Sequence, residues 1–356
     1  MARKLKVLLI VFVVLFISGS TIIYFSSSLW PSPDNSPVRV GWLTGDLHHL
    51  AYFVAKSENI SGEKSMFQKY GLSVIDANPM GYVNGPAEMD AIAAGEIDIG
   101  FLGLSPAITK HLNTGTNISI IGQVNTLGSA LVVKKALNDF KDLESKTIAT
   151  PGPGTIQYFL LLKLCEEKGV NIGAFDIVKL APADMKPAME SGAINAFLSW
   201  EPYCSDAVID KVGSVYVNSG EIWADHICCV MVASNDFVAG FPDVLINFTR
   251  AIIEAKDWIN NAKTSEIGSK EHSNLVDIAE KFTGRTTAVI ELALRNINYK
   301  CEIDTFFING FIEFTDKLID YQMVPSDRLE ERGYNSIIDL ASGMINTEFM
   351  ERAKEK

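Results

Sequence analysis

Two short segments combine residue types that could bind an anion at the start of a helix. In the first, Ser105 and Pro106 follow a predicted strand and precede an apolar run at residues 107–112. Serine is favoured as a helix cap and proline at the first helical position. The free amides and the dipole of such a helix start attract an anion, so Leu104, Ser105 and Pro106 are candidate ligand contacts. Without a ligand, the same residues would form a plain capped helix.

The second segment is Thr150-Pro-Gly-Pro-Gly-Thr155. Gly154 allows close approach of the backbone, and Thr155 is placed to cap the following helix, so a second set of amides could face the first across a gap. The segment is also close to the dinucleotide-binding pattern. It lacks the third glycine, however, and no acidic residue follows a strand at the expected distance. We therefore predict an anion site here and no cofactor.

The elements that would hold these segments repeat along the chain. Residues 89–106 and 186–203 each predict a short helix that ends at a glycine (Gly95, Gly192), then a buried strand, then a sharp corner with a proline. The repetition suggests two similar lobes. Because ligands bind beyond the carboxyl ends of strands in open parallel sheets, the two corners would face each other across a cleft.

These corners carry a family resemblance. The run Ala-Gly-Glu-Ile-Asp-Ile-Gly-Phe-Leu-Gly-Leu-Ser-Pro-Ala at 94–107, with the later Trp-Glu-Pro-Tyr at 200–203, resembles the substrate-binding proteins of ABC importers in the nitrate, sulfonate and taurine group. Residues 141–150 and 223–230 resemble the opening of the second lobe in that family and its return to the first. The resemblance implies an α/β, bilobal, periplasmic-binding-protein-like fold of type II, with two doubly wound sheets joined by a two-strand hinge.

The predicted organisation follows from this resemblance and from composition. A basic flank before a long apolar run indicates an uncleaved membrane anchor, and a stretch rich in Pro, Ser, Asp and Asn indicates a linker. The hinge is expected near Gly128. The predicted parts are an anchor or transmembrane segment at 1–29, a linker at 30–37, the first part of lobe one at 38–128, lobe two at 129–225, and the return to lobe one with the C-terminal helices at 226–356.

Further candidate contacts lie around the predicted cleft. The resemblance places ligand contacts in the loop with His48 and His49, but adjacent residues at a helix start cannot both face the cleft. Trp200 could stack on a ligand and Glu201 could bind a cation or amine; alternatively, Trp200 packs into its lobe and Glu201 caps the backbone nearby. The polar residues near the two lobe crossings complete the set: Asn125, Thr126, Ser129, Asp225 and His226.

The net charge and the cysteines limit which partners and which sites the chain is expected to have. The net charge of -12, from 31 basic and 43 acidic side chains, argues against nucleic acid, which needs a clustered basic excess. It does not argue against a small anion, whose binding depends on local donors. The chain has five cysteines, an odd number that makes a disulfide framework improbable. Adjacent Cys228 and Cys229 on a strand should point to opposite faces, so we predict buried thiols and no metal site.

Binding is the function that these features favour. The expected protein is an extracytoplasmic, membrane-anchored component of an ABC importer (secreted if the anchor is cleaved) that closes on a small oxyanion-bearing solute. No phosphate-binding loop is present, so ATP hydrolysis would belong to an ATPase that works with the partner permease. The segment 103–107 nearly matches a nucleophile elbow, but its last glycine is missing, and we predict no catalytic residue. The alternative is a thiamine-pyrimidine precursor binding protein or biosynthetic enzyme on the same fold.

Overall fold

The computed structural model describes residues 36–58, 60 and 64–355. Contacts divide the chain into two units, Met1–Asp34 and Asn35–Lys356. The predicted anchor and most of the predicted linker therefore lie outside the described residues. Within the part of the chain that the structure describes, no helix is both long enough and apolar enough to cross a membrane.

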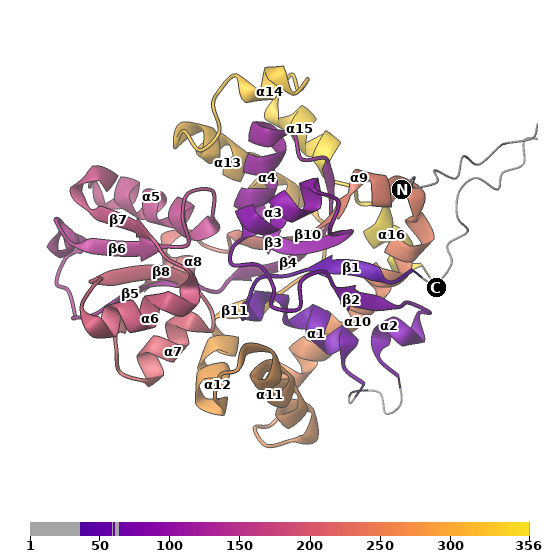
Figure 1. The fold of residues 1–356 in the computed structure, drawn as a ribbon, viewed down its shortest axis with the longest axis horizontal. Helices are drawn as coiled ribbons and strands as arrows, with labels where there is room; N and C mark the ends of the chain where they lie inside the picture. Colours follow the sequence, from indigo (N-terminus) through magenta and orange to yellow (C-terminus); the bar gives the residue numbers. More distant parts are fainter. Residues whose placement is uncertain (1–35, 59, 61–63, 356) are drawn as a thin grey trace, which may run out of the picture. The chain divides into compact units, whose positions relative to one another are not determined.

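The first lobe of the larger unit is built on a six-stranded sheet in the order β11-β4-β10-β3-β1-β2 (Figure 1). Its strands are β1 (Val38–Gly41), β2 (Val74–Asp76), β3 (Ile99–Gly103), β4 (Ile118–Leu127), β10 (Ile227–Ser234) and β11 (Ile297–Tyr299). β1 pairs in parallel with β2 and β3, whereas β10 runs antiparallel to β3 and β4. The returning strand β10 thus lies in the middle of the sheet, where it is buried along nearly its whole length.

The second lobe is built on a five-stranded sheet in the order β7-β6-β8-β5-β9. Its strands are β5 (Ser129–Val133), β6 (Thr147–Thr150), β7 (Asp176–Lys179), β8 (Ala196–Trp200) and β9 (Ser214–Asn218). β6 is parallel to β7 and β8, and β5 is antiparallel to β8 and β9. The predicted α/β fold with one sheet per lobe is confirmed, although both sheets are mixed because each contains an antiparallel strand that follows a lobe crossing, β10 in the first and β5 in the second.

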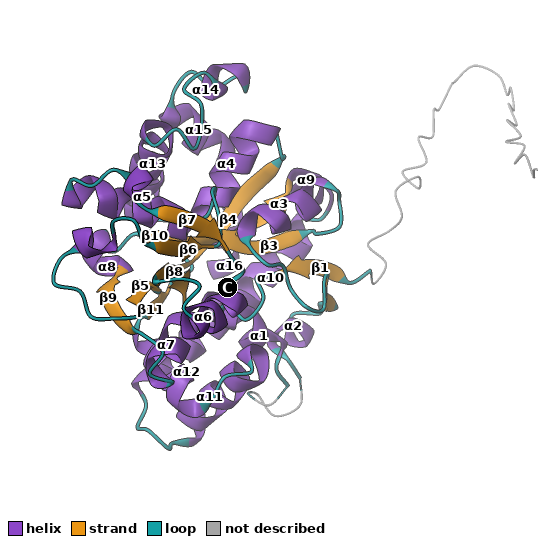
Figure 2. Cartoon of the chain, turned by 60° about the vertical axis from the view of Figure 1, so that its left-hand side comes forward, coloured by secondary structure: helices purple, strands orange, loops and turns teal. Residues whose placement is uncertain are grey.

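Helices flank both sheets (Figure 2). Those of the first lobe and the C-terminal region are α1 (Leu50–Lys56), α2 (Met66–Lys69), α3 (Gly85–Ala93), α4 (Leu104–Thr114), α9 (Asn235–Gly240), α10 (Pro242–Thr264), α11 (Lys270–Thr283), α12 (Thr287–Arg295), α13 (Thr305–Asp320), α14 (Arg328–Glu331), α15 (Ile337–Met344) and α16 (Glu348–Lys354). Those of the second lobe are α5 (Ile156–Lys168), α6 (Pro182–Ser191), α7 (Tyr203–Ile209) and α8 (Ser219–Ile222). Short 3₁₀ turns lie at Leu47–His49 (η1), Phe140–Leu143 (η2) and Ile172–Ala174 (η3).

The repeated pattern found in the sequence forms the same unit in each lobe. Gly95 and Gly192 follow α3 and α6 with φ of 73° and 83°, a left-handed conformation that glycine adopts without steric cost. Each glycine leads into a buried central strand, β3 or β8, and then into a helix, α4 or α7. The predicted echo is therefore confirmed as helix, strand, corner and helix on both sheets.

The crossing between the lobes is short. β4 continues to Leu127, next to the predicted hinge at Gly128, because it pairs with β10 on one side and β11 on the other. The chain then turns at Leu127 and Gly128, both with positive φ, and enters β5 at Ser129. The C-terminal helices contact both lobes, since α10 packs on α1 and α12 packs on α7.

Candidate functional site

A small pocket lies where the two lobes meet. It is lined by residues from both lobes: Leu43, Asp46, His48, Gly85, Gly103, Pro106, Thr155, Ile156, Gln157, Trp200, Cys228 and Cys229. The space left between them is about 10 Å³, roughly what one water molecule requires. A solute of several heavy atoms can therefore reach these side chains only if the lobes separate.

The start of α4 forms one side of the pocket, but not as predicted. Gly103 is the residue that caps α4, so Leu104, Ser105 and Pro106 occupy its first three positions. The prediction of Ser105 as cap is wrong because the backbone already turns helical at Leu104. The Ser105 hydroxyl is buried and has no hydrogen-bond partner within the described chain, and Ser105 does not line the pocket, whereas Gly103 and Pro106 do.

The start of α5 forms the opposite side. Thr155 is confirmed as the cap: its Oγ1 accepts a hydrogen bond from the Tyr158 amide at 3.3 Å and donates to the Gly152 carbonyl at 2.7 Å. In the first turn the amides of Ile156 and Gln157 have no intrahelical acceptor. Both residues line the pocket, so the positive end of α5 points at it. Gly154 has φ of 83° but does not line the pocket.

Trp200 and Glu201 at the end of β8 have different roles. Trp200 lines the pocket and packs against Leu43 and Tyr203, yet its indole N–H has no acceptor among the residues described. Glu201 is buried with both oxygens engaged, since it accepts hydrogen bonds from Asn296 Nδ2 at 2.7 Å and from the Ser205 amide at 3.0 Å. Glu201 thus tethers the second lobe to the residue after α12, and Trp200 offers a free donor.

The loop after β1 buries two histidines with different surroundings. The His49 Nδ1 accepts from the Leu43 amide at 3.1 Å, and burial holds the pKa of His49 well below its usual value. His49 is therefore neutral and does not line the pocket. His48 does line it, with Nε2 2.9 Å from the Gly128 carbonyl and Nδ1 3.2 Å from Asp46 Oδ1. As expected, only one of the adjacent pair reaches the cleft.

Burial and neighbouring charges shift the pKa values of His48 and Asp46. Burial raises the pKa of Asp46 to about 7. Burial also disfavours the imidazolium of His48, but the neighbouring Asp46 and Cys228 outweigh it and raise the pKa of His48 to about 9. Asp46, His48 and Cys228 therefore form a buried cluster in which the positive charge of His48 favours the ionised forms of Asp46 and Cys228.

Two of the three polar candidates near the first lobe crossing are hydrogen-bonded within the protein. Asn125 lies in β4, donates to the Leu127 carbonyl at 3.1 Å and accepts from the Cys229 amide at 3.1 Å. Ser129 accepts from Gln157 Nε2 at 3.0 Å. Thr126 is buried beside them, and its hydroxyl has no partner within the described residues. None of these three candidates lines the pocket.

The two candidates at the return crossing also lie away from the pocket. Asp225 is exposed, with a positive φ of 51°. His226 is buried, its ring is stacked on Trp223 and its Nδ1 is 3.1 Å from the Ile227 carbonyl. Burial lowers the pKa of His226, so this ring is neutral.

Cys228 and Cys229 are pocket residues that the sequence analysis did not identify. The expectation that their side chains point to opposite faces is wrong, because the pairing of β10 with β4 shifts register on both sides of Cys229 and brings the two sulfurs to 3.8 Å. A hydrogen bond from Cys229 holds the pKa of Cys228 well below its usual value, whereas burial raises that of Cys229. All five cysteines are buried and free.

Comparison with known proteins places this architecture in a family. A sequence profile of the NMT1-like family matches residues 33–270. The chain belongs to the NMT1-like family. The taurine-binding periplasmic protein of Escherichia coli is 30% identical over 200 residues, which cover 55% of this chain and 61% of that protein. The nitrate/nitrite binding protein NrtA of Nostoc is 25% identical over 263 residues, which cover 67% and 58%.

This NMT1-like chain has the same fold as a binding protein of known structure. The alkanesulfonate-binding protein SsuA of Xanthomonas axonopodis, bound to MOPS, superposes with a TM-score of 0.69 at 16% identity, over 87% of this chain and 98% of that one. The resemblance to nitrate, sulfonate and taurine binding proteins is therefore confirmed, and so is the bilobal periplasmic-binding-protein fold. These relatives are binding proteins, two of them named for a small anion or a zwitterionic sulfonate that they bind.

Proposed function

We propose that this chain is the extracytoplasmic substrate-binding component of an ABC importer and captures a small oxyanion-bearing solute of the sulfonate, taurine, nitrate or bicarbonate type. The observation that carries the proposal is the convergence of donors on one pocket. The free amides at the start of α5 line it, together with the indole N–H of Trp200, which has no partner among the described residues. The start of α4 lines it from the other lobe through Gly103 and Pro106, and Pro106 has no amide hydrogen. Helix starts and a buried free donor fit an acceptor-rich guest.

Hinge closure would link capture to transport. The lobes are connected through Leu127–Ser129 and through the segment before β10, and we propose these as the hinge between residues 38–128, 129–225 and 226–356. A ligand that contacts both helix starts only in the closed form stabilises that form by its differential affinity. The closed form would dock on a permease whose ATPase supplies the energy, and residues 1–29 would anchor the protein to the membrane. We propose no catalytic role.

Calorimetric titration of the full-length chain tests the ligand class. Taurine, an alkanesulfonate, nitrate and bicarbonate are the probes, and a cationic thiamine-pyrimidine precursor is the matched control. We expect at least one anion or sulfonate to bind in the micromolar range or tighter and the cationic heterocycle to release no heat. Binding of the heterocycle with no response to any of the four oxyanions would overturn the proposal and favour the alternative ligand class.

A further inference from the structure

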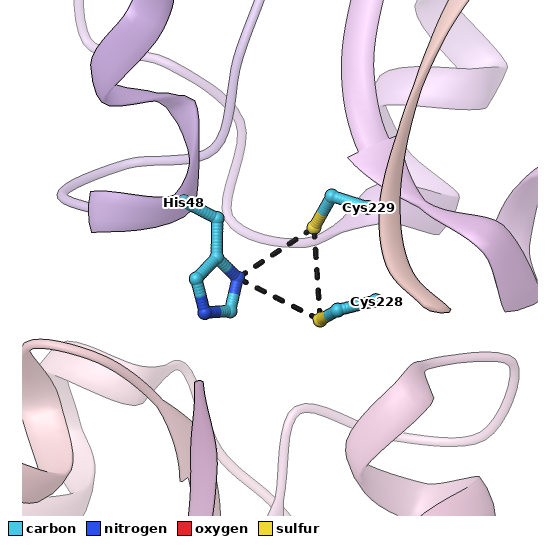
Figure 3. Close-up of side chains that lie close together, drawn as sticks. All are labelled: His48, Cys228 and Cys229. Carbon is cyan, nitrogen blue, oxygen red and sulfur yellow. Dashed lines mark hydrogen bonds between the residues drawn. The ribbon is translucent and has the colours of Figure 1, made fainter. Parts of the chain in front are cut away.

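Three potential metal ligands form a compact buried triangle on the first-lobe side of the pocket (Figure 3). The His48 Nδ1 is 3.7 Å from Cys228 Sγ and 3.6 Å from Cys229 Sγ, and the two sulfurs are 3.8 Å apart. Tetrahedral zinc has Zn–S bonds of about 2.3 Å and Zn–N bonds of about 2.0–2.1 Å, which set S···S near 3.8 Å and N···S near 3.6 Å. The triangle thus has the dimensions of one face of a zinc tetrahedron.

The fold holds this triangle through specific backbone features. In a regular strand, neighbouring side chains point to opposite faces. The register shifts around Cys229 remove that alternation, and Asn125 Oδ1 accepts the Cys229 amide at 3.1 Å beside them. Two sulfurs on consecutive residues therefore face one histidine. Filling a core with small apolar side chains would not require such an irregular strand.

The second nitrogen of His48 is oriented as in metal-binding histidines. Ligating histidines usually donate their other ring N–H to a carbonyl or carboxylate, which fixes the tautomer and directs the lone pair at the metal. The His48 Nε2 is 2.9 Å from the Gly128 carbonyl, and a proton donated there leaves the Nδ1 lone pair directed towards the sulfurs. Asp46 Oδ1, 3.2 Å from this Nδ1, adds another electron-rich atom. A metal ion bound here would take the place of the proton on His48 Nδ1 as the positive charge beside these converging atoms.

We propose that His48, Cys228 and Cys229 bind a thiophilic metal ion, Zn²⁺ by its fit to the distances, with the fourth coordination position turned to the cleft. All three residues line the pocket, so that position is accessible from it. Three protein ligands with one open position are the arrangement of zinc sites that exchange a bound molecule, in contrast to closed structural sites. If the proposed function holds, the ion would add a positive charge at the place where the two helix starts attract the anion.

Metal binding can be tested on the full-length chain directly. The chain is purified with a reductant, stripped with a chelator and titrated with Zn²⁺ against a chromophoric competitor, and bound zinc is measured by mass spectrometry. We expect one zinc per chain, and a loss of affinity of about a hundredfold or more in Cys228→Ser and in Cys229→Ser, since even outer-shell partners are worth 10–100-fold. Cys204→Ser is the control, because Cys204 is equally buried but lies outside the triangle.

A second measurement needs no variant and so does not depend on folding of the mutants. Co²⁺ bound to the unaltered chain should show intense thiolate-to-cobalt absorption from two sulfurs. The proposal is overturned if the reduced chain binds no zinc, if cobalt shows no thiolate bands, or if Cys228 and Cys229 form a disulfide that reductant does not open. Repeating the anion titration with chelator present separates the two proposals. If an anion binds but zinc does not, the metal proposal fails and the proposed function stands. If zinc binds but none of the four anions does, the proposed function fails and the metal proposal stands.

Discussion

The two walls of the pocket have opposite chemistry. The donor wall, formed by Thr155, Ile156, Gln157 and Trp200 of the second lobe, presents N–H groups and the positive end of α5. The thiol wall, formed by Asp46, His48, Cys228 and Cys229 of the first lobe, presents a carboxylate, an imidazole and two sulfurs. A single anion complements the donor wall but is repelled by the thiol wall unless a cation lies between them.

The two walls differ in how they are assembled from the sequence. The donor wall comes from a contiguous stretch, a glycine-rich turn with a capped helix, plus the end of one strand. The thiol wall is assembled from the loop after β1 and the start of β10, which are about 180 residues apart in the sequence. Variants of one wall, or of the junction between them, separate their contributions.

The largest effect is expected where the walls meet, at Gly128. This residue has φ of 87°, and a Cβ there would lie 2.2 Å from His48 Nε2. Gly128→Ala should lower the free energy of unfolding by about 2–4 kcal/mol, because it adds a clash with a buried ring to a left-handed backbone. Urea denaturation of the purified chain measures the loss.

Gly95→Ala is the matched control for Gly128→Ala. Gly95 has a similar φ of 73°, but an added Cβ would meet nothing within 4 Å. Its cost should be the backbone term alone, about 1–2 kcal/mol. Equal losses in the two variants would show that His48 is not held tightly against the crossing.

An intermediate effect is expected at Trp200 of the donor wall. Trp200→Phe removes the unpaired indole N–H, and a hydrogen bond to an anion contributes about 1.5–3 kcal/mol. Affinity for the oxyanion found by calorimetry should fall roughly tenfold to a hundredfold. Trp223→Phe serves as control, since Trp223 stacks on Phe159 and Phe314 and does not line the pocket. Unchanged affinity in Trp200→Phe would mean that the anion does not contact the donor wall at this residue.

The smallest effects distinguish the two helix starts. Thr155→Ala removes a side-chain cap from α5 and should lower the free energy of unfolding by about 1 kcal/mol in urea denaturation. Ser105→Ala removes a buried hydroxyl that has no partner among the described side chains and should change it by less than about 0.5 kcal/mol. A cost for Ser105→Ala as large as that for Thr155→Ala would show that the Ser105 hydroxyl makes a stabilising hydrogen bond in the folded chain.

Much of the fold was predictable because its signals are local. Gly95 and Gly192 mark the ends of two helices, because helices commonly end at a glycine in the left-handed conformation. The apolar runs after them are long enough for buried strands. Thr155 was identified as a cap from its place after a glycine turn. By contrast, the cap of α4 was predicted at Ser105 and lies at Gly103. The first helical residue depends on where β3 ends, and that is set by the pairing of β3 with its neighbours.

The sequence by itself determined two similar α/β lobes and a donor-rich helix start at Thr155. It also placed the chain in the nitrate, sulfonate and taurine binding group. Tertiary structure alone decided which polar residues share the pocket. Asn125 lies in a strand because β10 and β11 pair with β4, and the oxygens of Glu201 accept hydrogen bonds from a distant helix end and from its own corner. The thiol wall depends on a register shift between β4 and β10, and pairing register is set by contacts between strands that no stretch of either strand encodes alone.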